Sequence, residues 1–215
     1  MRLPGRLVRL FVGLIGFGAS LAFMVRARLG LGPWDVLHQG IARQTGLRIG
    51  WVVIGVSVLV LVLWLPLRQR PGFGTLANAL MVGLSLDLTL ALLPAPGPLG
   101  LRVTWLAVGI IANGAATGLY IGSALGPGPR DGLMTGLARR GYSIRSARTA
   151  IELSALGIGW ALGGAVGVGT VAYALAIGPL AQYFIPKFTV ALPGRTPSPG
   201  GPHSSQTSAM ARADG

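Results

Sequence analysis

Long uncharged runs between isolated basic residues constrain this chain most. Five stretches of 16 to 38 residues each contain at most one charged residue, and arginine or lysine bounds every one of them. A helix needs roughly 20 mostly apolar residues to cross the hydrocarbon core of a bilayer. The sequence therefore predicts an all-α polytopic membrane protein with six transmembrane helices, near residues 10–27, 49–67, 74–93, 103–124, 147–165 and 168–188.

Composition supports this class and excludes others. Hydrophobic residues make up 52% of the chain and charged residues only 11%, whereas soluble domains carry about 25% charged residues. The absence of cysteine excludes disulfides, iron–sulfur clusters and a cysteine nucleophile. No histidine–carboxylate cluster has metal-ligand spacing and no catalytic motif is present, so we expect no metal, no cofactor and no enzymatic activity.

The net charge of +13 reflects 18 basic against five acidic residues. Because the basic residues separate hydrophobic segments instead of gathering on one face, they predict a lipid bilayer as partner and no nucleic acid. The six-span assignment places 13 of them on cytoplasmic loops, with both termini cytoplasmic in the plasma (inner) membrane. A single membrane domain should cover residues 1–192, followed by a Pro-, Gly- and Ser-rich, disordered cytoplasmic tail at 193–215.

The two halves of the chain resemble each other. LGLGPWDVLHQGIAR (29–43) matches LGPGPRDGLMTGLAR (125–139) at nine of fifteen positions, at an offset of 96. GFGTLANALMVG (72–83) matches GVGTVAYALAIG (167–178) at seven of twelve positions, at an offset of 95. These ordered matches indicate a duplication, with repeat 1 over residues 7–95 and repeat 2 over residues 102–190.

Each repeat contains a Gly-Pro-x-Asp segment. Glycine ends the preceding helix, proline suits the first turn of a new one, and aspartate there favours the positive end of the helix dipole. Each segment predicts a helix of about ten residues, roughly 15 Å long and too short to span. Each repeat then crosses three times, as a three-helix repeat, and the two repeats are inverted.

An eight-span alternative remains open. If the short helices did cross, the repeats would lie parallel, and the count of basic residues on the two sides would be the same. We favour six spans, because Asp35, His38 and Gln39 would be costly in so short a helix facing lipid.

Several of these segments also resemble a known family. GPWDVLHQG, GFGTLAN, the buried Asp87, GPGPRDGLMTGL and ELSALGIGWALGGAVGVGT are similar to the YczE-type bacterial integral membrane proteins, which are related to the broader YitT group. The resemblance covers roughly residues 7–185. It implies a multi-spanning membrane protein and supplies no catalytic or binding residue.

Three carboxylates are the leading candidates for a substrate or ion pathway. Asp35 and Asp131 occupy matching positions, where they either bind a solute or cation or only cap their short helices. Asp87 lies deep in the third span, where an ionisable residue is a functional candidate unless it pairs internally, with Asn78 or an arginine. Asn78 and Asn113 are further polar candidates for the pathway.

The remaining polar positions have simpler interpretations beside the functional one. Arg130 matches Trp34 in the other repeat, which suits either a pathway with two different mouths or a basic anchor opposite an aromatic one. Arg148 and Glu152 have the spacing of a structural ion pair within one helix. The GxGT motifs permit tight turns or helix starts; their residues are Gly72, Gly74, Thr75, Gly167, Gly169 and Thr170.

These features favour a permease or permease-like protein that exposes a site between its halves to each side of the membrane in turn. Its substrate would be an unknown small solute. The alternative is a non-transporting accessory or regulatory protein, working as a homo-oligomer or with a membrane partner. Its support is the size of the chain and two stripes of small residues that would allow close helix packing: Gly114, Gly118, Gly122 and Gly126, and Gly159 with Gly163.

Overall fold

The computed structural model describes residues 3–94 and 97–189, and the regular structure in those ranges is helical. Its helices are α1 (Leu3–Ala27), α2 (Pro33–Thr45), α3 (Ile49–Trp64), α4 (Phe73–Leu92), α5 (Leu99–Gly122), α6 (Pro129–Ala138), α7 (Ile144–Ala161) and α8 (Val168–Phe188). Each predicted span coincides with one of the longer helices, and α2 and α6 are the predicted short helices. The predicted tail at 193–215 lies outside the described residues.

Several helices meet the requirements for crossing a membrane. α1, α4, α5 and α8 are long and apolar enough individually, and α2 and α3 meet the same measure together across a bend of 115°. α3 alone has 16 residues, and α7 carries Arg145, Arg148 and Glu152 within its 18 residues. The chain is therefore a polytopic helical membrane protein.

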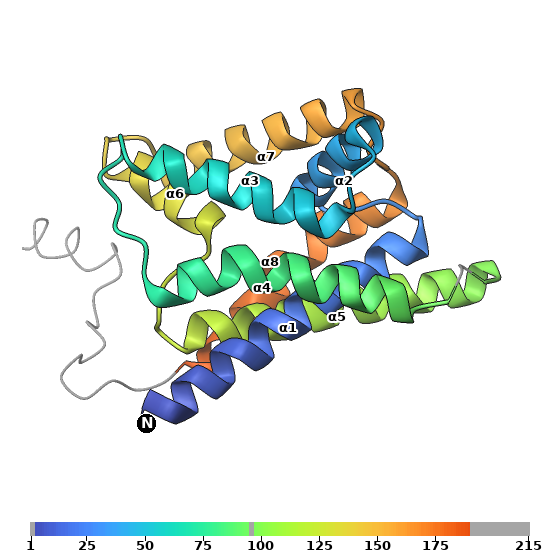
Figure 1. Cartoon of the computed structure of the whole chain (residues 1–215), viewed down its shortest axis with the longest axis horizontal. Helices are drawn as coiled ribbons and strands as arrows, with labels where there is room; N and C mark the ends of the chain where they lie inside the picture. The colour runs from blue at the N-terminus through green and yellow to red at the C-terminus, as the bar shows by residue number, and fades with distance from the viewer. Residues whose placement is uncertain (1–2, 95–96, 190–215) are drawn as a thin grey trace, which may run out of the picture.

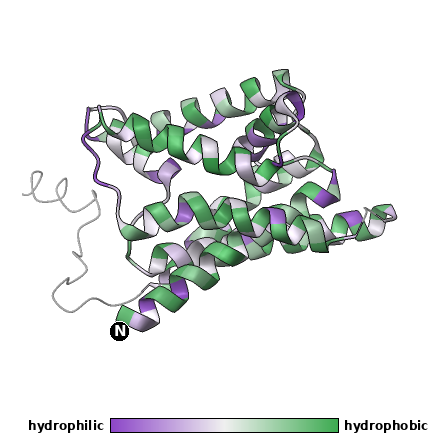
Figure 2. Cartoon of the chain, in the orientation of Figure 1, coloured by the Kyte–Doolittle hydropathy of each residue, from purple (hydrophilic) through white to green (hydrophobic). Residues whose placement is uncertain are grey.

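The helices form two layers (Figure 1). One layer contains α1, α4, α5 and α8, and the other contains α2, α3, α6 and α7. Figure 2 shows apolar residues along every helix, whereas strongly hydrophilic residues are most frequent at helix ends and in the loops. Large apolar side chains such as Leu88, Trp160 and Leu175 are exposed, as expected for helices whose outer faces contact lipid.

Small residues bring α1 and α5 close together at the centre of their layer. A Cβ atom on Gly13 would lie 2.7 Å from the amide nitrogen of Tyr120, and one on Gly109 would lie 2.7 Å from Cγ of Met24. Close helix approach of this kind is the usual role of glycine in membrane helices. The contacts advance in opposite directions along the two helices, so α1 and α5 are antiparallel.

The two GxGT motifs form matching helix starts. Thr75 Oγ1 accepts a hydrogen bond from the amide of Gly72, and Thr170 Oγ1 accepts one from Gly167, each at 3.2 Å. α4 and α8 each begin at the residue after that first glycine. The threonine hydroxyls thus satisfy amides that the first turn of a helix leaves without partners.

The middle glycine of each motif joins the two halves of the chain. The amide of Gly74 donates to the carbonyl of Leu125 at 2.9 Å, and the amide of Gly169 donates to the carbonyl of Leu29 at 2.7 Å. A Cβ atom on either glycine would lie 3.0 Å from the oxygen it binds. Glycine therefore stands at both positions because the backbones approach too closely for a side chain.

Two arginines at the starts of α1 and α5 cap the opposite helix. Arg6 donates to the carbonyls of residues 123–124 at 2.9 and 2.7 Å, where α5 ends. Arg102 donates to the carbonyls of residues 27–28, both at 2.8 Å, where α1 ends. The last carbonyls of a helix have no intrahelical partner, and a cation there also favours the negative end of the dipole.

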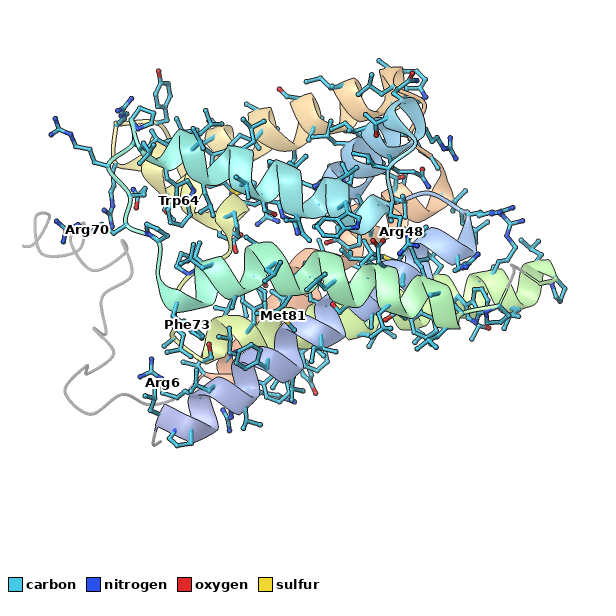
Figure 3. All side chains as sticks on the ribbon, viewed as in Figure 1. Arg6, Arg48, Trp64, Arg70, Phe73 and Met81 are labelled. Carbon is cyan, nitrogen blue, oxygen red and sulfur yellow. The ribbon has the colours of Figure 1, made fainter. Side chains whose placement is uncertain are left out.

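Removing either cap should therefore destabilise the protein to a similar degree. We expect Arg6→Ala and Arg102→Ala each to lower the free energy of unfolding by about 1.5–3 kcal/mol, the usual range for hydrogen bonds to charged groups. Thermal unfolding of the purified protein in detergent measures the effect. Arg70→Ala, at an exposed position in the loop between α3 and α4 (Figure 3), is the control. A cap variant with the same midpoint as this control would contradict the prediction.

Candidate functional site: a polar cavity between the layers

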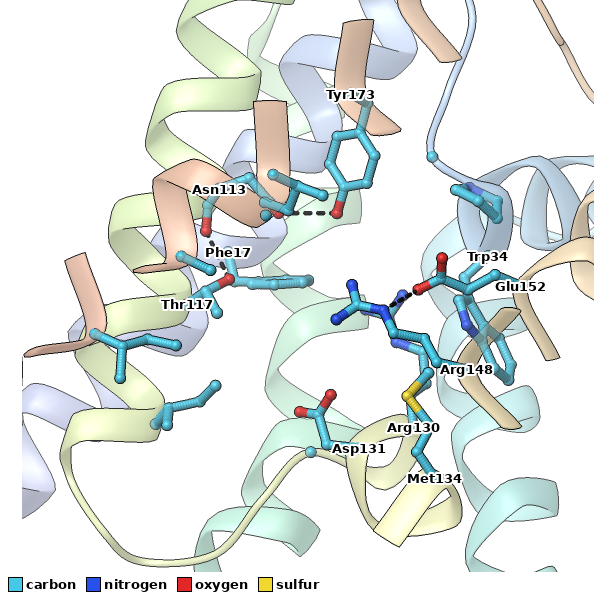
Figure 4. Close-up of a pocket in the computed structure, with 18 of the residues that line it drawn as sticks. Phe17, Trp34, Asn113, Thr117, Arg130, Asp131, Met134, Arg148, Glu152 and Tyr173 are labelled. Carbon is cyan, nitrogen blue, oxygen red and sulfur yellow. Dashed lines mark hydrogen bonds and ion pairs between the residues drawn. The ribbon is translucent and has the colours of Figure 1, made fainter. Parts of the chain in front are cut away.

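A cavity of about 740 Å³ lies between the two helix layers, and Figure 4 shows part of its lining. Residues from α1, α2, α4, α5, α6, α7 and α8 contribute to its wall. Along α8 the lining runs from Tyr173 to Pro186, toward the end of the molecule at which α1 begins. The same end is marked by the bond from Arg9 to the carbonyl of Phe188, at 2.9 Å.

The short helices α2 and α6 both begin at this cavity. Their N-cap residues, Gly32 and Gly128, are extended, and neither helix start has a side-chain cap hydrogen bond. Asp35 and Asp131 lie in the first turns and line the cavity. The hydrogen-bonded cap suggested by the sequence is not formed, because both carboxylates point toward the cavity and their neighbours there. They still lie at the positive ends of the helix dipoles.

The two aspartates have different neighbours. Asp131 Oδ2 accepts a hydrogen bond from the hydroxyl of Tyr120 at 2.9 Å. Asp35 Oδ1 lies 3.4 Å from Nδ1 of His38, and the side chains of Asp35 and His38 are both buried. Two residues that match in the sequence comparison of the halves thus contribute carboxylates in different environments to one cavity.

Arg130 lies between two aromatic rings. Its guanidinium carbon is 5.7 Å from the ring centre of Phe17 and 5.6 Å from that of Trp34. Trp34 is the residue that matches Arg130 in the sequence alignment, so these two positions contact each other across the cavity. A cation over the face of an aromatic ring is attracted by the ring quadrupole.

Amide side chains complete the polar lining. Asn113 is fully buried; its Nδ2 donates to Oγ of Ser20 at 2.9 Å, and its Oδ1 accepts from the hydroxyl of Tyr173 at 3.1 Å. Asn78 lines the same cavity from α4. Because both ends of the Asn113 amide are bonded, its position in the wall is fixed.

Positions that match in the sequence comparison of the two halves line the cavity in pairs. These pairs are Trp34 with Arg130, Asp35 with Asp131, Phe17 with Asn113, and Asn78 with Tyr173. Sequence reasoning finds the polar members but misses Phe17, Trp34 and Tyr173 as cavity residues. The repeat offset is the signal that would find them, since each is the counterpart of a predicted residue. No such signal points to Tyr120.

Asp87 is not brought together with the other two aspartates. Its Oδ1 accepts a hydrogen bond from the amide of Gly50 at 2.8 Å, in the first turn of α3. Asp87 is not among the residues that line the cavity, whereas its counterpart Gln182 is. Among the described residues, the Asp87 carboxylate thus serves the start of a neighbouring helix, an arrangement that sequence reasoning does not anticipate.

Arg148 and Glu152 lie at the edge of the cavity. Arg148 Nε donates to Glu152 Oε1 at 3.0 Å, at the i,i+4 spacing noted in the sequence. Both side chains line the cavity and remain partly accessible. The ion pair that the sequence predicts therefore lies at the opening of the cavity.

The fold and the apolar helices define the class as a multi-pass helical membrane protein with an internal polar cavity. Over residues 5–186 the chain matches the "Family of unknown function (DUF6198)". The chain belongs to this family.

Related proteins support the same assignment. A Haemophilus influenzae "Uncharacterized protein" is 42% identical over 175 residues, 81% of this chain and 79% of the relative. The Bacillus subtilis "Uncharacterized membrane protein YczE" is 32% identical over 181 residues, 82% of this chain and 84% of the relative. The resemblance to YczE-type proteins is therefore confirmed. No solved structure matches the chain.

Proposed function

We propose that the protein is a permease for a small solute, without enzymatic activity, in the plasma (inner) membrane. In this proposal the chain forms two inverted three-span repeats, six spans in all, with both termini cytoplasmic. Transporters of this architecture bind their solute where the repeats meet, at interrupted helices. The cavity at the starts of α2 and α6, lined by matching residues of both halves, supports this site.

The directions of the helices support inverted repeats. α1 and α5 occupy matching places in the two halves and run antiparallel, as their glycine contacts require. The same opposition is visible for α3 and α7 and for α4 and α8 (Figure 1). The reciprocal bonds from Gly74 to Leu125 and from Gly169 to Leu29 relate the halves in the same way.

The observation that carries the proposal is a difference between two matching helix interfaces, which we call seams. One seam lies between α3 and α4, and the other lies between α7 and α8. α3 packs against α4, and a Cβ atom on Gly83 would lie 2.4 Å from the carbonyl oxygen of Gly50. The counterpart of Gly83 is Gly178 on α8, where a Cβ atom would meet nothing within 4 Å. Gly178 lines the cavity instead. The α3–α4 seam is thus closed and the α7–α8 seam is open.

The residues on the two seams fit this difference. α3 begins at Ile49 and α7 at Ile144, so Val53 and Ser57 on α3 match Arg148 and Glu152 on α7. Val53 is buried, whereas Arg148 and Glu152 line the open cavity. Charged side chains require water or partners, so an open seam suits them and a closed apolar seam does not.

This asymmetry suggests how access could alternate. When inverted repeats exchange conformations, the closed seam opens and the open seam closes around the same site. In the present state the cavity extends toward the end at which α1 begins, which is the cytoplasmic side in the proposed topology. In the exchanged state, α3 and α4 would separate and admit solute from the opposite side.

Cysteine labelling tests this exchange directly, because the chain contains no native cysteine. Ile177 lines the cavity, and its counterpart Val82 is 3% exposed. In membranes we expect the Ile177→Cys variant to react with an impermeant maleimide from the cytoplasmic side. The Val82→Cys variant should be protected in this state and should react from the opposite side when a solute gradient drives turnover.

The matched pair also separates the two candidate functions. Protection of the Val82→Cys variant from both sides under every gradient, with Ile177→Cys still reactive, would count against a permease. That result would favour the non-transporting accessory or regulatory protein.

A further inference from the structure

Besides the Arg148–Glu152 ion pair, three charged residues line the cavity without forming an ion pair with one another: Asp35, Asp131 and Arg130. Among the described residues, Arg130 forms neither an ion pair nor a side-chain hydrogen bond. Its guanidinium is half-buried between two aromatic rings and has no hydrogen-bond acceptor, which is costly unless something else binds it. The cavity therefore offers an unused donor to a bound molecule.

The balance of charge argues against a simple anion or a simple cation. Three acidic residues, Asp35, Asp131 and Glu152, line the cavity together with two basic residues, Arg130 and Arg148, which leaves one acidic charge in excess. The starts of α2 and α6 contribute roughly half a positive charge each, which offsets that excess. An anion would pair with Arg130 but would also face the carboxylates, and a cation would leave Arg130 without a partner.

We propose that the cavity binds a small zwitterion, with the carboxylate of the solute on Arg130 and its ammonium group on Asp35 and Asp131. This inference names the solute class of the proposed permease, and so it rests on that function for its role in transport. The planar guanidinium suits a carboxylate because its N–H groups donate in parallel. The rings of Phe17 and Trp34 hold the Arg130 guanidinium from two sides.

The rest of the lining fits a solute of this kind. The hydroxyl of Tyr120 orients the Asp131 carboxylate through its hydrogen bond. In the opposite wall, the hydroxyl of Tyr173 donates a hydrogen bond to Asn113. A volume of about 740 Å³ lies within the range of about 300–1,000 Å³ that is usual for small-molecule sites. The cavity thus has room for an aromatic or aliphatic side chain and for water.

Binding to the purified full-length protein tests the solute class without requiring transport. The probes are L-phenylalanine, phenethylamine and 3-phenylpropionate, and L-leucine, isopentylamine and 4-methylpentanoate. Within each set only the amino acid carries both charges. Isothermal titration calorimetry in detergent should show the amino acid of at least one set binding at least about tenfold more tightly than its two analogues, because each analogue lacks one charge-assisted contact.

Variants then assign the contacts. Arg130→Gln should reduce amino acid affinity at least about tenfold and bring it close to that of the amine. Arg130→Lys should retain part of the preference, which separates loss of charge from loss of fold. Arg70→Gln, in the exposed loop, is the control and should bind as the unmodified protein does.

The outcomes distinguish this inference from the proposed function. Equal affinity for the amine or the carboxylate, or no binding of either amino acid, would overturn the zwitterion site. Amino acid binding without uptake into proteoliposomes would retain the site and reject the permease. Uptake of the amine alone would retain the permease and reject the zwitterion.

Discussion

The Gly132→Ala substitution is expected to lower the thermal unfolding midpoint of this protein strongly. A Cβ atom at position 132 would lie 1.9 Å from Cζ2 of Trp64. Trp64 is 2% exposed, and its Nε1 donates to the carbonyl of Pro129 at 3.0 Å. The ring cannot move without losing that bond or colliding with its neighbours. Overpacking typically lowers the free energy of unfolding by about 1–3 kcal/mol. For Gly132→Ala we expect a loss of about 3 kcal/mol or more.

Gly157→Ala is the matched control. Position 157 lies within α7, and a Cβ atom there would meet nothing within 4 Å. Alanine favours a helix over glycine by up to about 1 kcal/mol, so this variant should be as stable as the unmodified protein or slightly more so. Differential scanning of both proteins in the same detergent compares them, and equal midpoints would show that α3 and α6 do not meet through Trp64.

The Gly178→Trp substitution should abolish transport without unfolding the protein. Gly178 lines the cavity and has open space beside it. In the proposed permease, an indole ring there would occupy the volume through which the solute passes and would prevent the α7–α8 seam from closing. We expect proteoliposome uptake of the amino acid that binds most tightly to fall at least about tenfold, the effect of about 1.4 kcal/mol, with little change in the unfolding midpoint.

Gly157→Trp again supplies the control, because the same ring is added at an exposed position on the neighbouring helix. It should leave uptake intact. Gly178→Ala tests the graded case and should slow uptake less than tryptophan does. Full uptake by the Gly178→Trp variant would mean that solute does not pass the α7–α8 seam.

The positions of the helices follow from the sequence because lipid imposes strong rules. Uncharged runs must be helical to satisfy their backbone groups, and arginines mark where those runs end. The starts of α2 and α6 follow from proline, which fits the first turn of a helix. α1 nevertheless begins at Leu3, ahead of the predicted start at residue 10, since a helix can continue past the apolar part of its sequence.

The contacts between helices do not follow in the same way. Spacing along the chain could not reveal that Asp87 lies beside the start of α3, because that neighbour is chosen by packing. Gly83 and Gly178 are the last residues of the two matching segments 72–83 and 167–178, and yet one is tightly packed and the other faces open space. The shared motif does not encode how closely each helix packs against its neighbours.

The crossed arginine caps have a consequence for biosynthesis. When α1 first leaves the ribosome and inserts, Arg102 has not yet been translated, so the carbonyls of residues 27–28 lack the donor that they have in the finished protein. The missing bonds form only after α5 follows. A fragment that stops before α5 lacks these two hydrogen bonds, and we expect membrane proteases to degrade it faster than the full-length chain.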